Sequence, residues 1–502
     1  MIPFTGYSQS GGIDYKNEFE QSVLTNHSSA SDIELLLAIS EGGSAQLVEQ
    51  VSREIDQLFN DLEDKNIHSK SEEKQLKLIF KATHKSLFTK YQEVSNFNKI
   101  FESGIYNCVS ATAIYSLILE KYQIPYQIKE TPTHVYVLAY PGTKNIVLES
   151  TAPENGYFSP GSSAIQKAVK SLVDLKYYTQ AEVDSMGVEN VYMAFHFSED
   201  AINIKQLAGL QYQNEGITFF NEEDYKKALN AIRKSALFYP SNRNELFQFV
   251  LLSKLLDGAQ FEDYEEIQYL TDYANISKSE KKNVLFSYSN ILNRKLYNQS
   301  KVQEMDSIFS LINLQLKDST LLKSLAEMHY QAYSNFYGQK GEIRKALEFG
   351  HMAYALNPLD VSTQSLITTS VMRELSTRGA TLSTIDHMKD YEKTYPFLAK
   401  NNMFQSLYFH VYSGVAYSHF RADDFKNGMY YLKIMEDVLA EYGENLQYDE
   451  NLFGMVYAEA GAAYYRERKY WKAKQIIEKG LKIMPNHPEL KVRLSIVMDE
   501  LD

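Results

Sequence analysis

The stretch of sequence that decides the fold reads Gly104-Ile105-Tyr106-Asn107-Cys108-Val109-Ser110-Ala111-Thr112-Ala113-Ile114-Tyr115. Gly104 interrupts the preceding pattern, and Asn107 is a residue type that caps helix N-termini. We therefore expect a helix that has Cys108 in its first turn and runs to about Lys121. Unpaired backbone N–H groups and the positive end of the helix dipole would there stabilise a thiolate, and an oxyanion that develops beside it.

Two β-strands are expected downstream, on either side of the turn formed by residues 141–144. Residues 133–140 are rich in β-branched and aromatic types, and residues 145–151 would form the partner strand. If the loop holds only the four turn residues, Tyr140 pairs with Asn145 and paired numbers sum to 285. His134 then lies opposite Thr151, with Glu149 as its diagonal neighbour on the same face. A loop error of one residue would put His134 and Glu149 on opposite faces.

These residues form a candidate catalytic triad. Cys108, the only cysteine in the chain, would be the nucleophile, His134 its base, and Glu149 the acid that orients the histidine. A cysteine or histidine considered alone is more often a buried structural residue. The order of the residues along the chain favours the catalytic interpretation. Glu130 or Glu154 could serve in place of Glu149.

The order of a cysteine at a helix start, a histidine opening a strand and an acid near the end of the next strand resembles the transglutaminase-like superfamily. This superfamily includes transglutaminases, peptide N-glycanases and many bacterial proteins regarded as peptidases. The local matches are Asn107-Cys108 with Ala111 and Ala113, Ile124-Pro125, His134-Val135-Tyr136-Val137 and Leu148-Glu149-Ser150-Thr151. Glu149 and Ser150 stand where the family usually has Asp and Pro, so the acid is one methylene longer than usual.

The resemblance covers about residues 70–200. It implies an α+β domain of the papain/transglutaminase-like class, in which a helix packs on an antiparallel sheet. It also implies a side-chain donor to the oxyanion, for which Asn107 is the first candidate and Gln92 and Asn98 are others. No histidine pair has a metal-ligand spacing such as His-x3-His, so we expect no metal and no cofactor.

From about residue 205 the sequence predicts helices only, and small, aromatic and proline residues recur at fixed offsets. The first set is Gly216, Phe219, Tyr225, Ala228, Ile232 and Pro240, and adding 245 to each number gives Gly461, Tyr464, Tyr470, Ala473, Ile477 and Pro485. This pattern resembles the tetratricopeptide repeat, in which small residues lie where two helices cross. An all-helical domain with accidental offsets is the alternative.

Two further copies match less completely. The third keeps Ala346, Gly350, Ala353 and Pro358 but has Ser334 where glycine is usual. The fourth contains Gly414, Tyr417, Phe425 and Gly428. It is expected to carry two extra residues in its turn, because 425 − 414 is 11 where 225 − 216 is 9. Residues 244–330 are expected to be helical, without an assignable register.

The 502-residue chain is too long for one ordinary core. We expect a flexible tail over residues 1–15, a transglutaminase-like domain with N-terminal helices over 16–204, and a superhelix of tetratricopeptide-type repeats over 205–502. A hydrophobic fraction of 44% and a charged fraction of 23% are typical of folded soluble proteins.

Charge and composition narrow the expected partners. A net charge of −13 argues against a nucleic-acid partner, because phosphate binding needs a concentrated basic surface. No apolar stretch is long enough to span a membrane, and the first residues lack a secretory signal. A single cysteine permits neither an internal disulfide nor a cysteine-based zinc site. We expect a cytoplasmic protein, or an exported one if a signal peptide has been removed.

The sequence therefore supports two functional hypotheses. In the first, the chain is a thiol-dependent acyl-transfer enzyme, a peptidase or amidase that forms a thioester on Cys108, and the concave face of its repeats binds a peptide or protein. In the second, the transglutaminase-like module is inactive and the repeats form a scaffold for protein interactions. Substrate identity, hydrolysis versus transamidation, and oligomeric state are left open.

Overall fold

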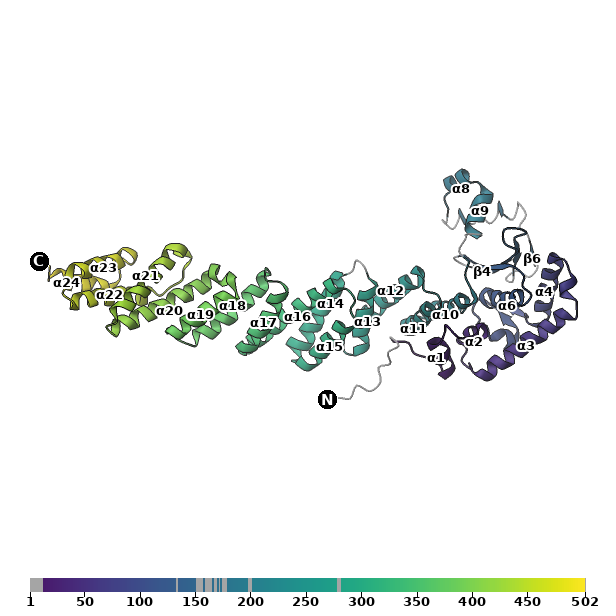
Figure 1. The fold of residues 1–502 in the computed structure, drawn as a ribbon, viewed down its shortest axis with the longest axis horizontal. Coiled ribbons are helices and arrows are strands. Elements are labelled where there is room, and N and C mark those ends of the chain that lie inside the picture. The colour runs from purple at the N-terminus through teal and green to yellow at the C-terminus, as the bar shows by residue number, and fades with distance from the viewer. Residues whose placement is uncertain are drawn as a thin grey trace. The chain divides into compact units, whose positions relative to one another are not determined.

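The computed structural model describes residues 12–131, 134–149, 157–158, 165–166, 169–170, 172–173, 178–196, 201–277 and 281–501. The chain forms two compact units, Met1–Ser277 and Lys278–Asp502 (Figure 1). The first unit combines helices with a small sheet, and the described part of the second is helical. Among the described residues, no helix has the length and apolar character needed to cross a bilayer.

The first unit begins with helices, continues through the sheet and ends with helices. Its elements are α1 (Glu18–Thr25), α2 (Asp32–Leu37), α3 (Ala45–Glu63), the 3-10 turn η1 (Ile67–Ser69), α4 (Glu72–Ser86), β1 (Lys90–Tyr91), α5 (Lys99–Ser103), β2 (Ile105–Tyr106), α6 (Cys108–Lys121), β3 (Tyr126–Thr131), β4 (His134–Ala139), β5 (Ile146–Leu148), β6 (Tyr157–Phe158), α8 (Gln180–Met186), α9 (Val188–His196), α10 (Ile204–Asn221), α11 (Tyr225–Phe238), α12 (Asn242–Leu256) and α13 (Tyr264–Ile276).

The main sheet has the order β3-β4-β5-β6, and each described neighbouring pair is antiparallel. The register between β4 and β5 pairs Val137 with Leu148 and Ala139 with Ile146, so paired numbers sum to 285. The expected hairpin register is confirmed. Its last expected pair, His134 with Thr151, lies partly outside the described residues.

Helix α6 is the central element of this half of the unit. Most of its positions are buried, and its apolar residues belong to one continuous core with strands β3, β4 and β5. The Thr112 hydroxyl donates to the Val135 carbonyl of β4 at 3.2 Å, which joins the helix to the sheet. A helix that is apolar on every side is stable only when it is enclosed. Cys108, at its N-terminal end, is partly exposed.

Helix α10 belongs to the same core. Leu207 and Tyr212 are each 0% exposed and pack in the cluster that also contains α2, α3 and α6. The buried Gln211 amide accepts from the Phe97 N–H at 2.8 Å and donates to the Leu36 carbonyl at 3.1 Å. The boundary expected at 204/205 therefore falls inside a continuous core.

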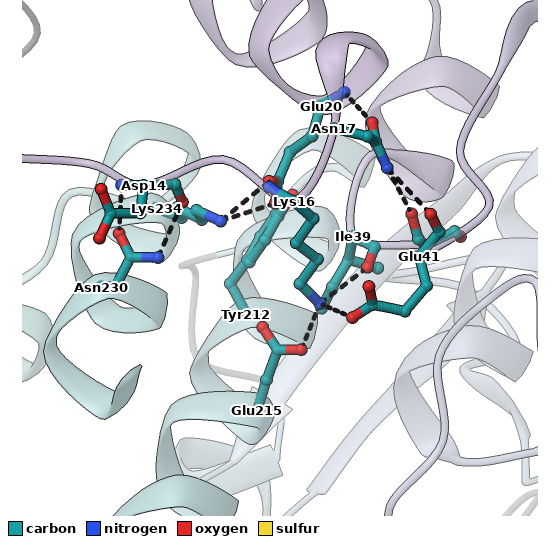
Figure 2. A network of polar contacts seen from close by, with 11 residues as sticks. Asp14, Lys16, Asn17, Glu20, Ile39, Glu41, Tyr212, Glu215, Asn230 and Lys234 are labelled. Carbon is teal, nitrogen blue, oxygen red and sulfur yellow. Dashed lines mark hydrogen bonds and ion pairs between the residues drawn. The ribbon is translucent and has the colours of Figure 1, made fainter. Parts of the chain in front are cut away.

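A polar network attaches the N-terminal segment to α10 and α11 (Figure 2). The carboxylate of Glu20, 0% exposed, accepts from Lys234 Nζ at 2.9 Å on each oxygen and from the Tyr212 hydroxyl at 2.8 Å. Asn230 bonds both sides of the Asp14 backbone: its Oδ1 accepts from the N–H and its Nδ2 donates to the carbonyl, each at 2.8 Å. The part of the expected tail that the structure describes is thus held by specific contacts.

The second unit consists of successive helices. Its elements are α14 (Lys281–Leu292), the π-helical turn η2 (Asn293–Asn298), α15 (Val302–Gln315), α16 (Ser319–Gln339), α17 (Ile343–Leu356), α18 (Val361–Ser376), α19 (Leu382–Thr394), the 3-10 turn η3 (Pro396–Lys400), α20 (Asn402–Arg421), α21 (Phe425–Tyr442), the 3-10 turn η4 (Gly443–Asn445), α22 (Glu450–Arg466), α23 (Tyr470–Ile483) and α24 (Pro488–Met498).

Four helical hairpins, one in the first unit and three in the second, share one turn geometry. The turns are residues 222–224, 340–342, 422–424 and 467–469, each of three residues. The middle residue is left-handed in all four: Glu223 (φ 62°), Gly341 (φ 78°), Asp423 (φ 58°) and Arg468 (φ 58°). In each turn the third residue donates its N–H to the carbonyl five positions earlier, at 2.9 Å. The shared geometry supports the expected repetition.

The small residues of the first and last copies lie where their two helices cross. A Cβ built on Gly216 would come within 2.6 Å of Ile232 Cδ1, and one on Gly461 within 2.5 Å of Ile477 Cγ1. Because real side chains do not approach so closely, only glycine fits without displacement of the isoleucine.

The fourth copy differs from the expectation. Its turn is the same length as the others, so the two expected extra residues are absent. Adding 200 to the first copy places Ala416, 0% exposed, at the position of Gly216. Gly414 serves another contact, because a Cβ there would lie 2.4 Å from the Ala380 Cβ. The prediction was wrong because the turn, and not the nearest glycine, sets the register.

Candidate active site

Cys108 is the first residue of α6, and Asn107 is its N-cap. The Ser110 N–H donates to Asn107 Oδ1 at 2.9 Å, and the Asn107 N–H donates to Ser110 Oγ at 2.9 Å. This reciprocal cap satisfies two backbone donors. The N–H groups of Cys108 and Val109, at the start of the helix, have no acceptor within it and are available to a substrate oxyanion.

The Asn107 side-chain amide binds the loop that precedes α6. Asn107 is 1% exposed, and its Nδ2 donates to the Glu93 carbonyl at 3.2 Å and to the Ser95 carbonyl at 2.8 Å. Both amide hydrogens are thereby used. Asn107 binds the preceding loop to the start of α6, which leaves it no hydrogen for the oxyanion role expected from the sequence.

His134 and Glu149 meet as the hairpin register requires. His134 is the first residue of β4, and Glu149 directly follows β5. His134 Nε2 lies 3.2 Å from Glu149 Oε2, and the two side chains are 25% and 16% exposed. An ionised carboxylate only accepts hydrogen bonds, so Nε2 carries the proton in this contact. Glu149 thereby determines which nitrogen, Nδ1, is left for the thiol.

His134 also contacts Cys108. Burial lowers the pKa of His134, but hydrogen bonds to Cys108 and Glu149, together with the negative charges of both groups, raise it to about 9. The ring therefore carries its proton at neutral pH and lies between two groups that are negative when ionised. A thiol, an imidazole and a carboxylate in this order are the groups that a thiol nucleophile, its base and an orienting acid require.

Tyrosine side chains surround these three residues. The charge of Glu149 contributes to raised pKa values of Tyr91, Tyr115 and Tyr136, although burial is the largest cause for each. Tyr115 and Tyr136 are buried, whereas Tyr91 is partly exposed. Of these three tyrosines, only Tyr91 also faces solvent.

The other residues considered from the sequence lie elsewhere or have other partners. Asn98 donates to Glu102 Oε1 at 2.6 Å, and the Gln92 side chain is exposed. Glu130 accepts from Tyr239 at 2.7 Å and from Arg243 at 2.6 Å, so it joins β3 to the end of α11 and to α12. Glu154 lies outside the described residues.

Among the described residues, no group of three or more His, Cys, Asp or Glu side chains is arranged to hold a metal ion. No protein-family model matches the chain, and comparison with curated proteins gives no match. The case for a function therefore rests on the geometry of the site.

Proposed function

We propose that this chain is a thiol-dependent acyl-transfer enzyme of the transglutaminase-like type, acting as a peptidase or amidase. The observation that carries the proposal is the position of His134, whose Nε2 lies 3.2 Å from Glu149 Oε2 and whose pKa is raised by the neighbouring Cys108 thiol as well as by Glu149. A structural histidine needs neither partner. A nucleophilic cysteine needs a base, and that base needs an orienting acid.

The proposed reaction has two halves. The Cys108 sulfur attacks the amide carbonyl carbon, and the oxyanion that forms lies at the start of α6, near the free N–H groups. Collapse of this intermediate breaks the C–N bond, and the amine leaves with the proton that His134 donates. Water then attacks the thioester and transfers a proton to His134, the S–C bond breaks, and the acid product leaves.

The helical hairpins support a peptide or protein as the substrate or partner. If they are tetratricopeptide repeats, as their spacing suggests, their inner face would bind an extended or helical peptide segment. We propose hydrolysis over transamidation, because water needs no binding site of its own.

Reaction with p-nitrophenyl acetate tests the proposal. The wild-type protein should release a stoichiometric burst of p-nitrophenolate, Cys108→Ala should release none above background, and His134→Ala should slow the burst on the order of 10²-fold or more. A burst that survives Cys108→Ala would refute the proposal. A thiol that reacts equally fast with and without His134 would favour the inactive interaction scaffold.

A further inference from the structure

Tyr91 is held next to the nucleophile by the backbone. It ends β1, which pairs in parallel with β2 so that Tyr91 lies beside Tyr106, two residues before Cys108. The Gln92 N–H donates to the Tyr106 carbonyl at 2.9 Å, and the Thr89 N–H donates to the Gly104 carbonyl at 2.8 Å. The Tyr91 ring packs edge-on against Tyr106, with centroids 5.8 Å apart.

The two segments approach each other closely at Gly104. Gly104 has φ +72°, and a Cβ there would lie 2.1 Å from Thr89 Oγ1. On the other side of Tyr91, the Asn107 amide holds the carbonyls of Glu93 and Ser95. Tyr91 is therefore bracketed by fixed contacts before and after it, which restricts where its side chain can go.

The surroundings of Tyr91 define its chemistry. Burial, followed by the negative charges of Cys108, Glu93, Glu149 and Tyr106, raises its pKa to about 12. The charges of the thiol and the acid both act on this phenol, which keeps its proton throughout the physiological range. Among the described residues, the Tyr91 hydroxyl has no hydrogen-bond acceptor. Of the amide candidates, Asn107 donates both hydrogens to loop carbonyls, Asn98 donates to Glu102, and the Gln92 side chain is exposed.

We propose that the Tyr91 hydroxyl donates the side-chain hydrogen bond to the oxyanion formed when Cys108 attacks a carbonyl, which makes it a catalytic residue. The inference rests on the proposed function. A partly exposed phenol at the site edge can reach a bound carbonyl, whereas the buried Tyr115 cannot. The bond strengthens as negative charge develops on oxygen, so its effect falls on the transition state.

Two reagents that modify Cys108 in the 502-residue chain separate an oxyanion role of Tyr91 from a purely structural one. Acylation by p-nitrophenyl acetate passes through an oxyanion, whereas alkylation by iodoacetamide displaces iodide at an sp³ carbon and forms none. Tyr91→Phe keeps the ring and removes the hydroxyl. We expect acylation to slow on the order of 10²-fold and alkylation to change less than about twofold.

Tyr122→Phe is the matched control, because its hydroxyl donates to the Phe59 carbonyl at 3.1 Å, outside the candidate active site. It should leave both rates unchanged. If Tyr91→Phe slows neither reaction, or slows both equally, the oxyanion role is wrong while the proposed function stands. If acylation persists in Cys108→Ala, the proposed function fails, and the role of Tyr91 fails with it. Circular dichroism of each variant checks that its fold is intact.

Discussion

At the scale of single residues, the candidate site is decided by which hydrogens and lone pairs are already in use. Asn107 has the right chemistry for an oxyanion donor, but it donates both amide hydrogens to loop carbonyls. His134 retains a nitrogen for the thiol because Glu149 takes the other. The roles of these residues therefore depend on which hydrogen-bond partners they already have, more than on residue type.

Replacing Glu149 tests whether this carboxylate supports the protonated His134 ring. Glu149→Gln removes a charge that helps to raise the pKa of His134, so the pKa should fall from about 9 toward or below its ordinary value of 6.5. The measurement is an NMR titration of the His134 imidazole C–H signals. Glu54→Gln, at a partly exposed position of α3 outside the candidate active site, makes the same charge change and should leave the titration as it is. An unchanged pKa in Glu149→Gln would show that the acid does not support the histidine.

The raised pKa of His134 also predicts how the stability of the fold depends on pH. A folded-state pKa above the unfolded one stabilises the fold through the protonated ring, fully below about pH 6.5 and progressively less as pH rises through about 9. The stability difference between wild type and Glu149→Gln should therefore shrink over that interval in urea unfolding at a series of pH values.

Much of the candidate site could be predicted from the sequence because its determinants are local. A cap residue beside the cysteine places Cys108, and the short connection of residues 140–145 sets the register of His134 and Glu149. Tyr91 carried no such signal. Its strand has two residues, and its partner strand begins fourteen positions later, so only the folded backbone brings it to the thiol.

At the scale of elements, the repeated turn explains both a success and an error. The offsets of the first and last copies were predicted because glycine marks the crossing. The fourth copy was misaligned because its crossing position holds Ala416 and Gly414 was taken in its place, while its left-handed turn residue, Asp423, gives no signal in the sequence. Where glycine is absent, a turn of this kind leaves no distinctive residue type.

The turn also predicts opposite effects of glycine at neighbouring positions. Arg468 has φ 58°, so Arg468→Gly should relieve strain and stabilise the protein by about 1 kcal/mol. Gly341→Ala, at φ 78°, should cost about the same. Glu467→Gly is the control, because Glu467 has φ −82° and glycine there only adds freedom to the unfolded chain. Urea unfolding of the full chain measures all three, and a loss of stability in Arg468→Gly would contradict the assignment of strain.

At the scale of the whole chain, the unit Met1–Ser277 joins the sheet domain to the first hairpin. The repetition of helices was visible in the sequence, but this shared core was not. Glu20 and Lys234 are far apart along the chain, and each is a charged residue that normally lies at the surface. Nothing in their local sequence indicates that they meet at almost zero exposure.

The buried Glu20–Lys234 pair predicts that two lysines of α11 differ strongly in how much their replacement destabilises the protein. Lys234→Met leaves the Glu20 carboxylate buried without its cation and should destabilise the protein by about 3–5 kcal/mol. Adding Glu20→Gln should restore part of that loss. Lys226→Met, which removes an exposed ion pair with Glu265, should cost about 1 kcal/mol or less. Urea unfolding measures the three variants, and equal costs for the two lysines would mean that the Glu20 pair is not buried in solution.

Gln211 has a consequence for how the protein opens. One side chain of α10 holds the Phe97 amide and the Leu36 carbonyl, so detaching the loop that leads to Cys108 from that helix breaks a buried hydrogen bond. The Phe97 amide should therefore exchange its hydrogen with solvent only in the same rare openings that release the amides of α10. Cys108 and the first helical hairpin should thus open together, and a change that loosens α10 should also loosen the loop that leads to Cys108.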